Sequence, residues 1–155
     1  MGLRSGGWML DETDLKIISE LCRNARGSFR QLADRVGVHP STLISRVGRL
    51  EKDGVIKGYT ARLDLEKLGY DFMAIVELTI PKKLLEIQHR LRSLPGVVAI
   101  FDVTGDTDSV LLIACENTRA FNKTIKKIHE IPEVQRTNSH VVLNVIKDWS
   151  DFVPV

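Results

Sequence analysis

The stretch that decides the fold runs from Ser28 to Tyr59 and consists of SFRQLADRVGVHPSTLISRVGRLEKDGVIKGY. Ser28 can cap a helix, and Gln31 completes the capping-box spacing in which each side chain bonds the other residue's backbone N–H. Gly37 stands where that helix should end, because glycine readily adopts the left-handed conformation that follows a last turn. Pro40 suits the first turn of a second helix, where its missing N–H would be unpaired in any case. The stretch therefore predicts two short helices joined by a tight turn.

The second helix of this pair is expected to have two different faces. Leu43, Val47 and Leu50 recur at helical spacing and predict a buried face, which Ile44 borders. The other side carries small hydroxyl groups and arginines: Ser41, Thr42, Ser45, Arg46 and Arg49. Hydroxyls can bond phosphate oxygens at close range, and an arginine can fork onto guanine or bind a phosphate. This layout is typical of a helix-turn-helix whose second helix contacts DNA. The alternative is an ordinary helical hairpin with a solvated polar face.

The sequence continues from this helix as RVGRLEKDGVIKGY at residues 46–59, with LD at 63–64 and KLG at 67–69. Together these segments closely resemble the Lrp/AsnC family of transcriptional regulators. In that family the pattern runs from a recognition helix through a Gly-Val-Ile turn into a connecting strand. His39 is a departure, because the family often has serine before the proline and histidine is a poorer N-cap. The resemblance extends from Leu10 to the C-terminus and implies a DNA-binding regulator.

The first domain is expected to span residues 9–64, as a winged-helix or helix-turn-helix domain with a connecting strand. A further helix at 11–24 should precede the pair and be capped by Asp11, with Asp14 reaching back. Its apolar stripe is predicted to contain Leu15, Ile18, Leu21 and Cys22. Residues 55–64 are predicted to be extended, with a break at Gly58. Residues 65–71 are the expected hinge.

The second domain is expected to span residues 72–155. Its hydrophobic periodicity predicts, in order, strand 72–80, helix 84–94, strand 97–103, strand 109–115, helix 121–131 and a last strand at 141–146, for which an earlier start is the alternative. This β-α-β-β-α-β order is that of the split βαβ, or ferredoxin-like, fold. The fold class of the whole chain is therefore predicted to be α+β.

The predicted sheet is apolar on both faces, although two helices can cover only one of them. The side expected to lie open carries Met73, Ile75, Val98, Ile100, Leu111, Ile113, Val142 and Ile146. An apolar face of that size rarely stays in contact with water. We therefore expect a homodimer formed by sheet-to-sheet packing, which would present two recognition helices to a two-fold symmetric site on double-stranded DNA. The family resemblance implies further assembly into tetramers or octamers.

In the Lrp/AsnC family the second domain binds effectors, so the resemblance also implies a small-molecule effector, commonly an amino acid. The expected effector-binding residues are Gly105, Asp106, Thr107, Asp108, Thr137 and Ser139. Gly105 and Asp108 match the family's Gly-x-x-Asp loop. A glycine lets backbone N–H groups approach a carboxylate, and an aspartate can pair with an α-ammonium group. The alternative is that these acids only favour a tight turn.

Composition limits the functional classes further. The chain has 155 residues and is 43% apolar, without an apolar run approaching the length of a membrane span. Residues 1–62 hold 11 Lys and Arg against 7 Asp and Glu, a net charge of +4, while the remainder has a net charge of −2. Only the first domain is therefore expected to meet DNA. Cys22 and Cys115 are isolated and are interpreted as buried free thiols, which fits the reducing cytoplasm.

The sequence shows no pattern typical of an enzyme. His39, His89, His129 and His140 lack metal-pair spacing, and a Gly-rich phosphate loop and a G-x-S-x-G motif are both missing. We therefore expect no catalytic residues, metal or cofactor. Three hypotheses remain: an effector-responsive, sequence-specific regulator, an architectural DNA-compacting protein, or an enzyme resembling the siroheme decarboxylases. The first is the one the residues favour.

Overall fold

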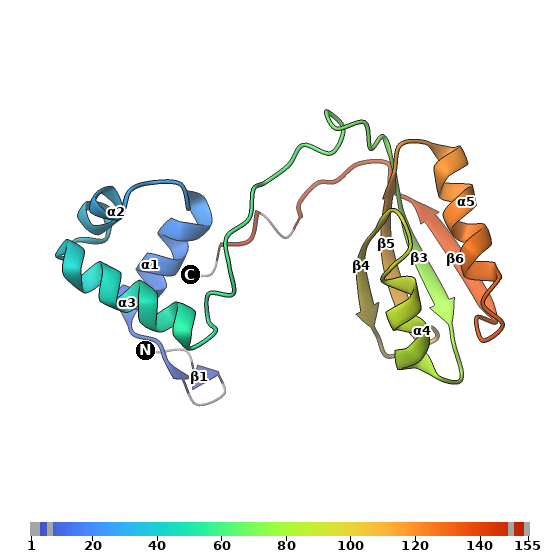
Figure 1. Ribbon diagram of the computed structural model, residues 1–155, viewed down its shortest axis with the longest axis horizontal. Helices are drawn as coiled ribbons and strands as arrows, with labels where there is room; N and C mark the ends of the chain where they lie inside the picture. Colours follow the sequence, from blue (N-terminus) through green and yellow to red (C-terminus); the bar gives the residue numbers. More distant parts are fainter. Residues whose placement is uncertain (1–3, 6–7, 149–150, 154–155) are drawn as a thin grey trace. The chain divides into compact units, whose positions relative to one another are not determined.

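The computed structural model describes residues 4–5, 8–148 and 151–153 of the chain. Contacts divide the chain into two compact units, Met1–Arg62 with Lys147–Val155, and Leu63–Ile146. This grouping differs from the predicted limits of 9–64 and 72–155 at the connection and at the C-terminal end. Helices α1 to α3 belong to the first unit, and the sheet from β3 to β6 with its two helices belongs to the second (Figure 1).

The helices of the first unit begin and end where local sequence signals place them. Asp11 and Asp14 form a capping box at the start of the first helix, and Ser28 and Gln31 form another at the second. Gly37, with φ of 79°, ends the second helix in the left-handed conformation. Two short strands, β1 (Arg4–Ser5) and β2 (Trp8–Met9), pair ahead of the helices. The helices are α1 (Glu12–Arg23), α2 (Phe29–Val36) and α3 (Pro40–Lys52).

The first core lies between these three helices and differs from the prediction on α1. The buried apolar side chains are Ile17, Leu21, Leu32, Ala33, Leu43, Val47 and Leu50. On α1 the inward stripe is Asp14, Ile17 and Leu21, whereas Cys22 is exposed. The prediction was correct for Leu21 and for Ile18, which packs against the core, but it missed Ile17, and the expectation of a buried Cys22 thiol was wrong. The two stripes are neighbours on the helical wheel, and a charged residue at position 14 concealed the correct one.

The connection between the units contains turns but no strand among the residues that the structure describes. Residues 57–64 have no assigned secondary structure, and 65–69 form a turn, so the predicted connecting strand is absent from this single chain. A strand needs a neighbouring edge to satisfy its backbone groups, and none pairs with this segment.

The second unit is a four-stranded antiparallel sheet with two helices. The strand order is β4-β5-β3-β6, which is the expected ferredoxin-like arrangement. One core lies between the sheet and these two helices. It contains Ala74, Val76 and Leu78 of the strand at 72–79, Ile87 of the helix at 84–91 and Ile128 of the helix at 118–129, all of them fully buried. Both helices therefore cover one face of the sheet. The elements are β3 (Phe72–Thr79), α4 (Leu84–Leu91), β4 (Val97–Asp102), β5 (Ser109–Cys115), α5 (Thr118–His129) and β6 (Arg136–Val141).

The last strand lies earlier in the chain than predicted. The apolar run 141–146 suggested a strand, but β6 is the polar segment Arg136–Val141, and Leu143 and Ile146 beyond it are 87% and 92% exposed. β6 pairs only with β3 and forms an edge of the sheet. An edge strand is partly solvated, so its residues need not be apolar, and hydrophobicity is a poor guide to its position.

The face of the sheet away from the helices is apolar along β4, β5 and most of β3, whereas Glu77 of β3 and Asn138 and His140 of β6 form a polar cluster on it. The predicted membership of this face needs correction. Leu111 and Ile113 are fully buried under the helices, and they pair with Val76 and Ala74. Ile100 pairs with Leu111 and packs against the same core, and Val142 and Ile146 lie beyond the last strand. The residues that pair across the open face between β3 and β5 are Met73 with Ala114, Ile75 with Leu112, and Glu77 with Val110. Phe101 on β4 extends this open face, because it pairs with Val110. A bulge between Val97 and Ala99 shifts the register of β4, which the period-two pattern could not anticipate.

Candidate functional site

Helix α3 turns its apolar side into the core and its small polar side outward. Leu43, Val47 and Leu50 are buried. The exposed residues of the helix outside this buried stripe include Ser41, Thr42, Ile44, Ser45 and Gly48. His39 caps the helix, since its Nδ1 lies 3.4 Å from the backbone N of Ser41 and 2.8 Å from the Ser41 Oγ. The histidine therefore fills the N-cap position despite its low intrinsic preference.

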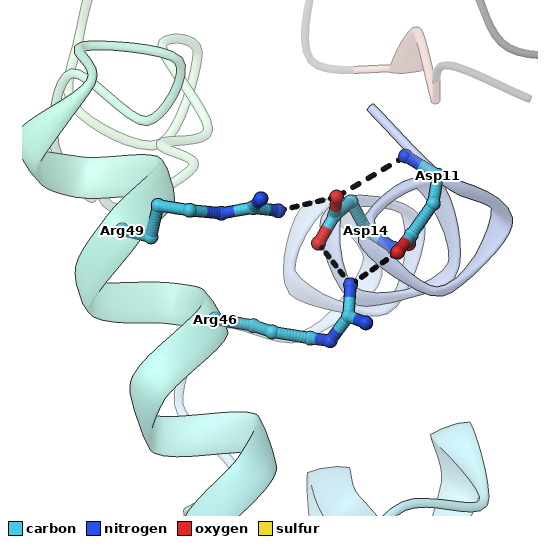
Figure 2. Close-up of polar contacts among 4 residues, drawn as sticks. All are labelled: Asp11, Asp14, Arg46 and Arg49. Atoms are coloured by element: carbon cyan, nitrogen blue, oxygen red, sulfur yellow. Dashed lines mark hydrogen bonds and ion pairs between the residues drawn. The ribbon is translucent and has the colours of Figure 1, made fainter. Parts of the chain in front are cut away.

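The two arginines of α3 do not extend along this outward face. Figure 2 shows both side chains reaching from α3 to the carboxylates of α1. Nη1 of Arg46 lies 2.6 Å from Asp11 Oδ2 and 2.8 Å from Asp14 Oδ1, and Nη2 of Arg49 lies 2.5 Å from Asp14 Oδ2. The Asp14 side chain is only 1% exposed, and its buried negative charge is balanced by both arginines. The helical wheel placed the two arginines among the outward residues, but their long side chains follow the nearest opposite charges instead.

These ion pairs alter the titration of the exposed partners. The hydrogen bond from Arg46 is the main cause that lowers the pKa of Asp11 below its usual value. The hydrogen bond to Asp11 raises the pKa of Arg46, and the bond to Asp14 adds to this. Asp11 and Arg46 therefore both stay charged at neutral pH. The sequence predicted Asp14 only as a capping residue. Its pairing with the arginines of α3 could have been inferred from one feature of the sequence, because Asp14 is an acidic residue at helical spacing from the buried Ile17 and Leu21.

A second contact ties the start of the connection to α3. The Tyr59 hydroxyl donates a hydrogen bond of 2.8 Å to Glu51 Oε1. Burial raises the pKa of Tyr59 to about 12, with further contributions from the Glu51 hydrogen bond and charge. This contact places an aromatic ring beside the last turn of α3.

The predicted effector loop closes onto the end of β3. Asp108 Oδ2 accepts a hydrogen bond of 2.6 Å from the backbone N–H of Ile80, and the Thr107 hydroxyl donates one of 2.7 Å to the carbonyl of Leu78. Gly105 has a φ of 123°, which favours glycine. Gly105 and Asp106 are exposed, whereas Thr107 and Asp108 are half-buried. One carboxylate oxygen of Asp108 is thus used in the fold, and the turn itself is confirmed.

The two predicted polar residues on β6 lie on the helix side of the sheet. Thr137 pairs with Leu78 and Ser139 pairs with Val76. The Thr137 hydroxyl lies 2.7 Å from Nε2 of His129 on α5. Leu78 therefore lies between the loop and Thr137, which places these two parts of the predicted site on opposite sides of β3. Their binding of an effector remains a prediction.

Two further classes of site were searched for in the part of the chain that the structure describes. No group of three or more His, Cys, Asp and Glu side chains there is arranged to hold a metal ion. No helix among those residues is long and apolar enough to cross a membrane.

Comparison with known proteins identifies the class and then the family. The model of the winged helix-turn-helix DNA-binding domain matches residues 10–57, and that of the Lrp/AsnC ligand binding domain matches residues 73–151. The chain is thus a transcriptional regulator with a DNA-binding and a ligand-binding domain. It belongs to the Lrp/AsnC family.

Individual relatives agree with this assignment. An uncharacterized HTH-type transcriptional regulator of Pyrococcus abyssi is 38% identical over 141 residues, which cover 90% of this chain and 96% of that one. The feast or famine regulatory protein Rv3291c from M. tuberculosis, solved with L-methionine, is 32% identical, with a TM-score of 0.85 over 94% of this chain and 99% of that one. The NMB0573/L-Met complex from Neisseria meningitidis is 31% identical, with a TM-score of 0.83 over 90% and 93%. The relatives are named as regulators, which favours regulation over the enzymatic alternative.

Proposed function

We propose that this protein is a sequence-specific DNA-binding regulator whose assembly or DNA affinity responds to an amino acid. The observation that carries the proposal is the outward face of α3, where small side chains are exposed opposite the buried Leu43, Val47 and Leu50. Such a face can approach the major groove closely. The competing architectural function predicts affinity for DNA with little sequence preference. Selection from a random DNA pool distinguishes the two, because only a sequence-specific protein enriches a common motif.

In this proposal the hydroxyl residues and the arginines of α3 contact different parts of the DNA. Ser41, Thr42 and Ser45 approach the DNA directly with their hydroxyl groups. Arg46 and Arg49 each use one guanidinium nitrogen in the pairs with Asp14, and a guanidinium carries five N–H donors. The remaining donors are held in place by these pairs, so the arginines are suited to bind backbone phosphates at the edge of the groove. Phosphate contacts fix the position of the protein but carry little sequence information.

Arg46→Ala and Arg49→Ala are therefore expected to weaken binding to all DNA sequences alike. Each lost phosphate contact should reduce the slope of log affinity against log salt by about one. Fluorescence anisotropy at several salt concentrations measures both quantities. Arg35→Ala controls for the loss of one positive charge, since Arg35 is another arginine of this unit, in a surface ion pair 2.6 Å from Glu20. Circular dichroism must show that both α3 variants stay folded, because each removes a partner of the buried Asp14. Wild-type affinity in both α3 variants would remove this helix as the DNA contact.

The proposed effector site comprises the loop from Gly105 to Asp108 with Thr137 and Ser139. Two relatives were solved with L-methionine, which supports an amino acid as the chemical class. A zwitterion offers a carboxylate to the backbone N–H groups near Gly105 and an ammonium group to an aspartate. Asp106 is exposed, and Asp108 uses one oxygen for the Ile80 N–H, so both can contribute a carboxylate oxygen.

A thermal-shift screen against the twenty amino acids is expected to identify at least one that raises the melting temperature, because a ligand bound only by the folded state stabilises it. Calorimetry with that amino acid should then show strongly reduced affinity for Asp106→Ala. Asp71→Ala provides the control, since Asp71 is exposed at the other end of β3. If none of the twenty binds the wild type, the loop is a structural turn. Equal affinity of Asp106→Ala and the wild type would exclude Asp106.

We also infer that two copies pack through the open face of the sheet. Ile75 and Phe101 on this face are 39% and 38% exposed, and Met73 and Leu112 lie beside them. Covering these side chains in a dimer removes apolar surface from water. A dimer would also present two α3 helices to a two-fold symmetric DNA site, and further assembly to a tetramer or octamer belongs to the same proposal.

A further inference from the structure

Ile44 is an apolar side chain on the outward face of α3, and it is 53% exposed. The core does not need it, because Leu43, Val47 and Leu50 already fill the inward side of the helix. An exposed apolar residue is common on protein surfaces and by itself implies nothing. Its position on this particular helix is what gives it significance.

The residues around Ile44 on the helix surface are small. Ser41 lies one turn before it, Ser45 is adjacent, and Gly48 lies one turn after it, and all three are exposed. Small neighbours let the helix backbone come close to a binding surface. At such a distance Ile44 is the side chain of this patch that projects furthest.

The two arginines are held away from this patch. Arg46 and Arg49 are paired with Asp14, and Arg46 also with Asp11, on the flank of α3 that faces α1 (Figure 2). Base recognition through an arginine fork requires a free guanidinium edge directed at guanine. Each arginine is anchored toward α1 through one guanidinium nitrogen, so its remaining donors lie on that flank of α3, beside the outward patch of Ser41, Ile44, Ser45 and Gly48.

We propose that Ile44 is a specificity-determining residue that contacts the 5-methyl group of a thymine in the major groove. This proposal rests on the proposed function, in which α3 lies in that groove. The thymine methyl is the one apolar group that a base pair presents there, and apolar side chains recognise it. Cytosine in its place would present an amino donor, which an isoleucine cannot satisfy and would desolvate.

The test removes the methyl group from the DNA and the side chain from the protein, separately and together. A binding site is first selected from a random pool with the wild-type protein. Each thymine of that site is then replaced in turn by deoxyuridine, which differs only in lacking the methyl group. At one thymine the wild type should lose about fourfold in affinity, the equivalent of one buried methyl group. Ile44→Ala should bind the thymine and uracil sites equally, and Ile44→Val should keep part of the difference.

Two features keep the test interpretable. Alanine is a better helix former than isoleucine, so the exposed substitution leaves α3 folded. Leu63→Ala removes a similar side chain that is 62% exposed outside the three helices, and it should retain the full fourfold discrimination.

The possible outcomes distinguish failure of the Ile44 inference from failure of the proposed sequence-specific function. If a site is selected but no thymine couples to Ile44, this inference is overturned while sequence-specific binding stands. If the selection enriches no site, the proposed sequence-specific function fails and this inference fails with it. Equal loss of discrimination in Leu63→Ala and Ile44→Ala would also overturn it, because the effect would then be general.

Discussion

Replacing Asp14 with alanine is expected to destabilise the first unit by about 2–3 kcal/mol, which is a large part of the stability of a small domain. The Asp14 carboxylate is almost fully buried, and it binds Arg46, Arg49 and the backbone N–H of Asp11. Removing one partner of a fully buried ion pair costs about 3–5 kcal/mol. The effect here should be smaller, because the Arg46 and Arg49 side chains are 28% and 48% exposed and can turn toward water.

Hydrogen exchange measured by mass spectrometry is suited to this prediction, because it reports each part of the chain separately. The protected amides of α1 and α3 should exchange about 30- to 150-fold faster in Asp14→Ala, and those of β3 and β5 should be unchanged. Asp14→Asn keeps the shape and an acceptor for the Asp11 N–H but loses the charge, so its effect should be intermediate.

The same helix offers a matched control for Asp14. Glu20 also binds two arginines, with distances of 3.0 Å to Arg23 and 2.6 Å to Arg35, but these pairs lie at the surface. Exposed ion pairs contribute little, since water and salt screen them. Glu20→Ala should therefore leave the exchange rates nearly unchanged. If hydrogen exchange were accelerated equally in Asp14→Ala and Glu20→Ala, the buried ion pairs of Asp14 would stabilise the unit no more than the exposed pairs of Glu20.

Ile75→Asp is expected to convert the proposed dimer into monomers. Ile75 lies on the open face of the central strand β3, paired with Leu112 on β5 and with His140 on β6. A carboxylate there would lose its water against apolar side chains of the second copy, at a cost of several kcal/mol. His140 beside it already lies 3.6 Å from Glu77, so it compensates only part of this cost. In the monomer the same carboxylate stays in water, so the sheet itself should remain folded.

Analytical ultracentrifugation at micromolar concentration measures this change in mass, with circular dichroism to verify the fold. Leu85→Asp is the control, since Leu85 is an apolar residue on α4 that is 70% exposed, on the helix side of the sheet. It should remain dimeric. A monomeric wild type, or a dimeric Ile75→Asp, would contradict packing through the open face.

The limits of the helices in the first unit could be predicted from the sequence because they depend on short-range interactions. The bonds between Asp11 and Asp14, and between Ser28 and Gln31, join residues three apart. The left-handed Gly37 depends on one residue. The alternation along β3 was correct for the same reason, because a two-residue period is fixed by strand geometry. The family was recognisable from another local pattern, the segments 46–59, 63–64 and 67–69, and it was confirmed by comparison.

The sequence did not determine which residues meet across the fold. Arg46 binds Asp14 from 32 positions away, and the Ile80 N–H binds Asp108 from 28 positions away. The bulge in β4 and the edge position of β6 are likewise consequences of how strands pair. Such contacts form only when packing brings distant segments together, and a long side chain then turns to whichever partner lies nearest. The sequence by itself therefore determined the elements of this protein and its family. The tertiary structure decided the direction of the arginines of α3 and left Ile44 exposed beside the small residues Ser41, Ser45 and Gly48.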